Sequence, residues 1–175
     1  MLVSEPTHRK QISNIILAED DVDDQNIFQI ALEEIDSAIK THFVSNGKEL
    51  LNLLKTNQPD ILFLDLDMPY KNGLECLIEM KNNPALESIP VVVFSSTTKP
   101  SNIQTAYEVG AHLFFIKPPI YSDYLSSIKA IFKLDWSDPQ SVKEQYCING
   151  RYTAFSWWIG RMSQISDPSV PVDKW

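Results

Sequence analysis

The residues best suited to chemistry in this sequence each follow directly after a short apolar run. The seven residues from Ile61 to Asp67 form one such run, which Met68-Pro69 stops, and it reads as a strand buried on both faces, as in the centre of a parallel sheet. Ligands bind beyond the carboxyl ends of such strands, so polar side chains there are positioned for chemistry. Four such runs have polar residues at their carboxyl ends, and these residues are Asp20 and Asp21, Asp65 and Asp67, Ser95, and Lys117.

These residue types favour a metal ion beside a bound anion. Carboxylates brought together repel one another, and such clusters persist mainly when a divalent cation neutralises them. Oxygen ligands with room for water favour Mg²⁺. A lysine and a hydroxyl on the far side of the pocket suit a phosphoryl group, with a central aspartate as the attacking nucleophile. For a lone aspartate, the alternative is a helix cap or a loop residue.

The elements that must position these residues alternate along the chain. We expect strands at about 12–18, 39–44, 61–67, 91–94 and 112–116, with helices at about 23–35, 47–56, 74–81, 101–109 and 122–134. Asp23 or Asp24 is expected to cap the first helix. Right-handed crossovers of this kind predict an α/β fold with a doubly wound, five-stranded parallel sheet and five helices.

Composition narrows the possible partners. The net charge of −8 over 175 residues argues against nucleic acid as a partner, since that needs clustered Lys and Arg. Cys76 and Cys147 match no metal-ligand spacing and are expected to be reduced thiols. Because the sequence shows neither a signal peptide nor a membrane-length apolar run, we expect a soluble, cytoplasmic protein with no membrane partner.

Taken together, the motifs resemble the receiver domains of two-component response regulators. The resemblance covers about residues 13–135 and rests on the acidic pair, the strand ending at Asp65 with Met68-Pro69 and Gly73 after it, Ser95, and Lys117-Pro118. It implies a flavodoxin-like, CheY-like sheet of order 2-1-3-4-5. It also implies that Asp65 is the phosphoacceptor, that Ser95 and Lys117 bind the phosphoryl group, and that Mg²⁺ is held by Asp20, Asp21, Asp65 and the backbone carbonyl of Asp67.

The family also implies how such a protein signals. The phosphoryl group would come from a sensor histidine kinase or a histidine phosphotransfer protein, and the signal would pass to a downstream protein target by contact. Ser95 is one implied switch residue. Phe114 stands at the second switch position, an aromatic on the fifth strand, but it lacks the hydroxyl of the more familiar tyrosine; the alternative is that it only packs in the core.

The ends of the chain are harder to interpret. We divide it into a flexible leader (1–11), a receiver domain (12–136) and a C-terminal extension without its own core (137–175). Within the extension, Tyr152 to Ile159 suggests a short helix that packs on the receiver or on a second subunit, which makes a homodimer possible; the alternative is a flexible segment. Asp135-Trp136 resembles the single-domain receivers associated with bacterial phytochromes.

Two other functions fit parts of the pattern. Leu64-Asp65-Leu66-Asp67 also resembles the nucleophile motif of haloacid dehalogenase-like phosphatases, although the acidic pair of that family lies after the lysine in the chain. A nucleotide- or flavin-binding module would need a glycine-rich loop after the first strand, and none is present.

Overall fold

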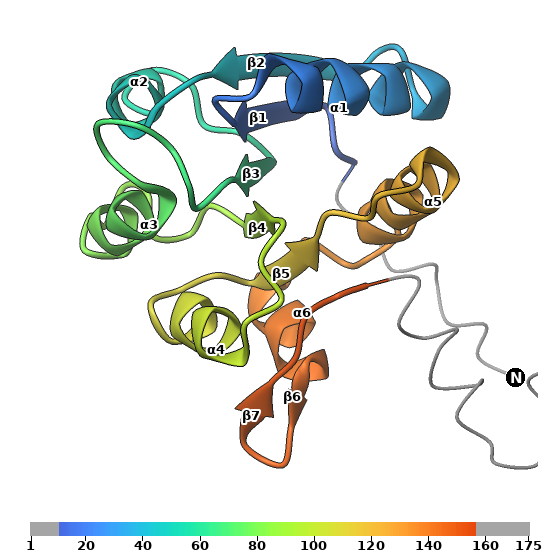
Figure 1. Cartoon of the computed structure of the whole chain (residues 1–175). Coiled ribbons are helices and arrows are strands. Elements are labelled where there is room, and N and C mark those ends of the chain that lie inside the picture. The colour runs from blue at the N-terminus through green and yellow to red at the C-terminus, as the bar shows by residue number, and fades with distance from the viewer. Residues whose placement is uncertain (1–10, 157–175) are drawn as a thin grey trace, which may run out of the picture.

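A five-stranded parallel sheet forms the centre of the molecule (Figure 1). The computed structural model describes residues 11–156. The strands lie in the order β2-β1-β3-β4-β5, which confirms the predicted fold and strand order. Their bounds are β1 (Asn14–Ala18), β2 (Lys40–Val44), β3 (Ile61–Leu64), β4 (Val91–Ser95) and β5 (Leu113–Ile116).

Helices cover both faces of the sheet and create two hydrophobic cores. Helices α1 and α5 lie on one face, and α2, α3 and α4 lie on the other (Figure 1). All four residues of β3 are fully buried, as expected for a strand in the middle of such a sheet. The helices are α1 (Val22–Ile35), α2 (Gly47–Leu53), α3 (Gly73–Lys81), α4 (Pro100–Glu108), α5 (Tyr121–Phe132) and α6 (Pro139–Gln145). None of the helices between residues 11 and 156 is both long and apolar enough to cross a membrane.

Trp136 at the end of the receiver and the first part of the extension both pack against the core. Trp136 is almost fully buried, and its indole N–H donates a hydrogen bond to the Ile131 carbonyl (2.9 Å). Helix α6, which we did not predict, buries Val142 in the same core as α1 and α5. A hairpin of β6 (Cys147–Ile148) and β7 (Arg151–Tyr152) follows, below α4 in Figure 1.

After the hairpin, the chain runs along the outer edge of β5. Phe155 forms a parallel bridge with Phe115: its N–H donates to the Phe114 carbonyl (2.7 Å) and its carbonyl accepts from the Ile116 N–H (3.3 Å). The predicted helix is therefore wrong for residues 152–156, while Trp157 to Ile159 lie outside the described residues. The domain boundaries after residues 11 and 136 stay predictions.

Candidate functional site at the carboxyl edge of the sheet

Three carboxylates converge where β1 and β3 end. Glu19, Asp20 and Asp65 each offer one oxygen, and these oxygens all lie within 4.8 Å of one another. Glu19 and Asp65 are buried, whereas Asp20 is exposed. The cluster differs from the predicted one because Glu19 takes the place that the sequence analysis gave to Asp21.

Asp21 has a structural task at the start of α1. It is the N-cap, and its Oδ1 accepts hydrogen bonds from the backbone N–H of Asp23 (2.8 Å) and of Asp24 (3.4 Å). Glu19 instead continues the strand ladder, with its N–H donating to the Val44 carbonyl (2.9 Å). The ladder thus extends one residue beyond β1 and places Glu19 at the rim. The prediction that Asp23 or Asp24 caps this helix was wrong.

Asp65 lies in a tight backbone setting at the end of β3. Its N–H donates to the Ala18 carbonyl (2.9 Å), and its Oδ2 accepts from the Asp67 N–H (3.2 Å). Behind it, α3 packs so closely that a Cβ on Gly73 would lie 2.0 Å from the Asp65 carbonyl oxygen. Burial raises the pKa of Asp65, although the nearby Lys117 opposes that shift. Asp67 is exposed beside it, and its role toward a metal stays a prediction.

Lys117 reaches into the site from the residue after β5. Its Nζ donates to Glu19 Oε2 (2.5 Å) and Asp24 Oδ2 (2.6 Å), and it lies 4.5 Å from the centre of the Phe94 ring. Burial lowers the pKa of Lys117, but the hydrogen bonds to the two carboxylates outweigh it and the net shift is upward. The sequence analysis did not identify Asp24 as a partner of this lysine.

The two predicted switch residues are both fully buried. Ser95 ends β4; its Oγ accepts from the Thr97 N–H (3.2 Å), and its carbonyl accepts from the Lys117 N–H (2.9 Å). Phe114 packs in the core beneath α4, and its N–H donates to Tyr107 Oη (3.0 Å). The structure thus places Ser95 at the carboxyl edge next to Lys117, and Phe114 further back in the sheet. Their roles as switches stay predictions.

The acidic cluster fits a hard divalent cation. It offers only oxygen ligands, it comes from two neighbouring strands, and two of its three members are withdrawn from solvent. Burial raises the pKa of Glu19, and the charge of Asp65 adds to that shift while Lys117 opposes it. A cation would relieve this repulsion between carboxylates.

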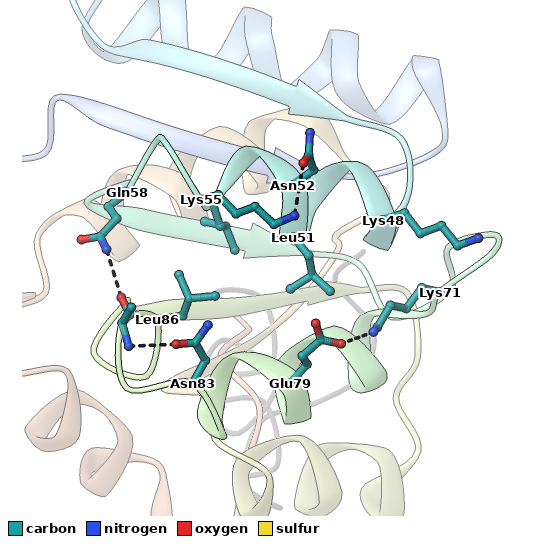
Figure 2. A pocket seen from close by; sticks show the side chains of 11 residues that line it. Lys48, Leu51, Asn52, Lys55, Gln58, Lys71, Glu79, Asn83 and Leu86 are labelled. Atoms are coloured by element: carbon teal, nitrogen blue, oxygen red, sulfur yellow. Dashed lines mark hydrogen bonds and ion pairs between the residues drawn. The ribbon is translucent and has the colours of Figure 1, made fainter.

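A hollow of about 650 Å³ lies between α2 and α3, away from the acidic cluster (Figure 2). Its lysines and leucines suggest a binding groove, but its polar groups pair with one another: Lys71 with Glu79, and Gln58 with the Ala85 carbonyl (3.0 Å). None of its lining residues belongs to the acidic cluster, so the volume of a hollow does not by itself locate the candidate site.

Comparison with known proteins agrees with this geometry. The family model of the response regulator receiver domain matches residues 15–129. The response regulator Rcp1 of Synechocystis is 27% identical over 124 residues, which is 67% of this chain and 84% of Rcp1. The probable transcriptional regulator ycf29 of Pyropia yezoensis is 29% identical over 69% of this chain, but over only 54% of its own length.

Solved structures give the same result. The phosphorylated cyanobacterial phytochrome response regulator RcpA is 29% identical and covers 72% of this chain and 95% of its own, with a TM-score of 0.66. The bacteriophytochrome response regulator RtBRR is 26% identical, with a TM-score of 0.60 over 78% of this chain and 91% of its own. The alternative of a haloacid dehalogenase-like phosphatase finds no support in these matches. The chain belongs to the response regulator receiver domain family and is a receiver of two-component signalling.

Proposed function

We propose that the protein accepts a phosphoryl group on Asp65 in a Mg²⁺-dependent reaction. An Asp65 oxygen attacks the phosphorus of a phosphohistidine on a histidine kinase or a histidine phosphotransfer protein. The new P–O bond forms as the P–N bond breaks, and the histidine nitrogen keeps the electron pair. The observation that carries this proposal is the single edge at which Glu19, Asp20, Asp65 and Lys117 meet.

Each residue at that edge has a separate task. Glu19, Asp20 and Asp65 would hold Mg²⁺, with the backbone carbonyl of Asp67 as a predicted fourth ligand. The cation neutralises the charge on the transferring phosphoryl group. Lys117 and the Ser95 hydroxyl would donate hydrogen bonds to the phosphoryl oxygens once the group is on Asp65. We also infer that the protein's only catalysis is its own phosphorylation and dephosphorylation.

The surface beside the site suits a histidine-bearing protein partner. Exposed apolar side chains lie on α1 and at the start of α5: Val22, Ile27, Ile30, Ile120 and Tyr121. Since α1 and α5 pack against each other, these side chains belong to neighbouring elements close to Lys117. A partner docked there would bury apolar surface and present its histidine to Asp65.

We infer that the output runs through β4 and β5. Hydrogen bonds from the phosphoryl group to Ser95 and Lys117 would draw in the loop after β4 and reshape the face of α4, β5 and α5. The extension lies on part of that face and would therefore respond to the change. If phosphorylation left amide exchange over residues 104–116 and 152–156 unaltered, this coupling would not exist.

The decisive experiment is intact-protein mass after incubation with acetyl phosphate and Mg²⁺. We expect a gain of one phosphoryl group that is lost in Asp65→Asn and with EDTA. A folded wild-type protein that gains nothing, or an Asp65→Asn variant that gains as much as wild type, would overturn the proposal.

Cytoplasmic localisation and the homodimer also stay predictions, and light scattering over a dilution series tests the homodimer.

A further inference from the structure

The amine of Lys117 is shared between two carboxylates, and only one of them belongs to the acidic cluster. Glu19 is a member of that cluster, whereas Asp24 comes from the first turn of α1. The two hydrogen bonds are of nearly equal length, 2.5 Å to Glu19 and 2.6 Å to Asp24. Two of the three donors of the ammonium group are therefore already engaged.

The two bonds differ in how easily they are given up. The Glu19 side chain is 2% exposed and the Asp24 side chain is 34% exposed, so water can replace Lys117 at Asp24 but not at Glu19. The lysine itself is 12% exposed and lies against Phe94, which leaves it few alternative positions. A lysine that turns toward Asp65 would thus release Asp24 first.

We propose that Asp24 is a positioning residue that holds Lys117 in the unphosphorylated state and releases it to the phosphoryl group on Asp65. This inference rests on the proposed function. It makes phosphorylation an exchange of partners for Lys117: the bond to Asp24 breaks as a bond to a phosphoryl oxygen forms. Asp24 opposes the switch in two ways, by holding the lysine and by placing a negative charge near the incoming anion.

Tyr124 could donate a hydrogen bond to Asp24 once Lys117 has moved away. The hydroxyl of Tyr124 is buried and has no hydrogen-bond partner among residues 11–156. Tyr124, Asp24 and Lys117 line the same hollow of about 160 Å³, and after burial the charge of Asp24 is the largest cause of the raised pKa of Tyr124. A buried unpaired hydroxyl is unfavourable, so a freed Asp24 carboxylate would gain a donor there.

These roles predict opposite effects for two substitutions. Asp24→Asn removes the charge that holds Lys117 and should tighten the binding of a phosphoryl mimic by roughly three- to tenfold. Tyr124→Phe removes the donor that receives Asp24 after the switch and should weaken that binding by about two- to fivefold. In the Asp24→Asn background, Tyr124→Phe should have a smaller effect, because the two residues act on each other.

The test is a titration with beryllium fluoride at saturating Mg²⁺, followed by the NMR amide signals of Ser95 and Lys117. Asp23→Asn is the matched control, since it removes the same charge from an exposed neighbour in the same helical turn. Circular dichroism confirms that each variant is folded. We expect Asp24→Asn to bind more tightly than both wild type and Asp23→Asn.

The outcomes separate this inference from the proposed function. Equal affinity of Asp24→Asn and Asp23→Asn, or weaker binding by Asp24→Asn, would overturn the role of Asp24 while leaving the phosphoacceptor intact. Absence of binding by folded wild-type protein, or equal binding by Asp65→Asn, would overturn both. A Tyr124→Phe effect of the same size in both backgrounds would show that Tyr124 does not act through Asp24.

Discussion

Strand β5 borders two regions of opposite character. At its carboxyl end, Lys117 enters a pocket of charged side chains in which Glu19 and Asp65 are buried. Along its outer edge, Phe155 pairs with the backbone, and Tyr107 stacks on Tyr152 with ring centres 4.5 Å apart. The first region keeps mutually repelling groups together and is suited to chemistry. The second consists of apolar and backbone contacts and is suited to stability, so substitutions in the two regions should have different consequences.

The largest expected effect on stability is at Trp136, where the extension begins. Trp136→Ala removes a large buried ring and should lower the free energy of unfolding by about 3 to 5 kcal/mol. Denaturant unfolding measures this loss, and Trp136→Phe should lose less. A change below about 1 kcal/mol would show that the burial of Trp136 contributes little to the fold.

The next largest effect concerns pH and the residue that leads into β5. His112 Nδ1 accepts a hydrogen bond from the Val91 N–H (3.0 Å), and burial lowers the pKa of His112 to about 3, with Lys81 and Lys143 adding to the shift. The unfolded chain takes up this proton below its ordinary pKa of about 6.5, while the native state does not. The contribution of neutral His112 to the free energy of unfolding is therefore fully present above the unfolded pKa of about 6.5, and it is lost as the pH falls toward 3.

The measured quantity is the slope of stability against pH. His112 should account for a loss of about 2 kcal/mol between pH 6.5 and pH 5. His112→Gln removes this titration, so its stability should vary less over that window than that of wild type. Identical slopes for the two proteins would show that His112 titrates as readily in the native state as in the unfolded chain.

Removing a single oxygen atom, the hydroxyl of Tyr107, should weaken the contact between α4 and the extension. Tyr107 Oη accepts from the Phe114 N–H (3.0 Å) and donates to the Thr153 carbonyl (3.1 Å). Tyr107→Phe leaves this buried N–H unpaired and should cost on the order of 1 to 2 kcal/mol, with faster amide exchange at Phe114 and Phe155. Tyr121→Phe, at an exposed tyrosine, is the control and should change stability by less than about 0.5 kcal/mol.

The smallest effect should have the opposite sign and lies in the charged region. Because the native pKa of Asp65 is raised, its contribution to stability is present below its unfolded pKa and is lost as pH rises through the native value. At neutral pH, without added cation, Asp65→Asn should therefore stabilise the fold by on the order of 1 kcal/mol. Thermal unfolding at pH 7 tests this, and destabilisation would mean that the ionised carboxylate is better paired than the pocket suggests.

The two regions also differ in how much the sequence reveals of them. Strands and helices of the receiver carry clear apolar patterns, so the doubly wound parallel sheet followed from the sequence, while the strand order followed from the resemblance to receiver domains. The carboxylates that the structure brings together include Glu19 and not Asp21, and the sequence could not show this because the three consecutive carboxylates, Glu19 to Asp21, are equivalent by type. Only the extra ladder bond of Glu19 and the cap at Asp21 distinguish them.

The extension gave no comparable signal. Its contacts join residues far apart in the chain, such as Tyr107 with Thr153, and many of them are backbone hydrogen bonds that any residue type could make. Asp24 was missed for a similar reason, since its partner Lys117 lies 93 positions away. Local patterns specify elements, whereas these pairings depend on how the finished sheet places its edges.

Parallel pairing at Phe155 also shields one border of the sheet. A bare edge strand offers unpaired backbone groups to any other extended chain, and native proteins usually cover or interrupt it. If signalling loosens the extension, the Phe114 carbonyl and the Ile116 N–H lose their partners, and the edge of β5 can then pair with another strand. The segment that covers this edge would then also control whether the protein can pair with a strand from another molecule.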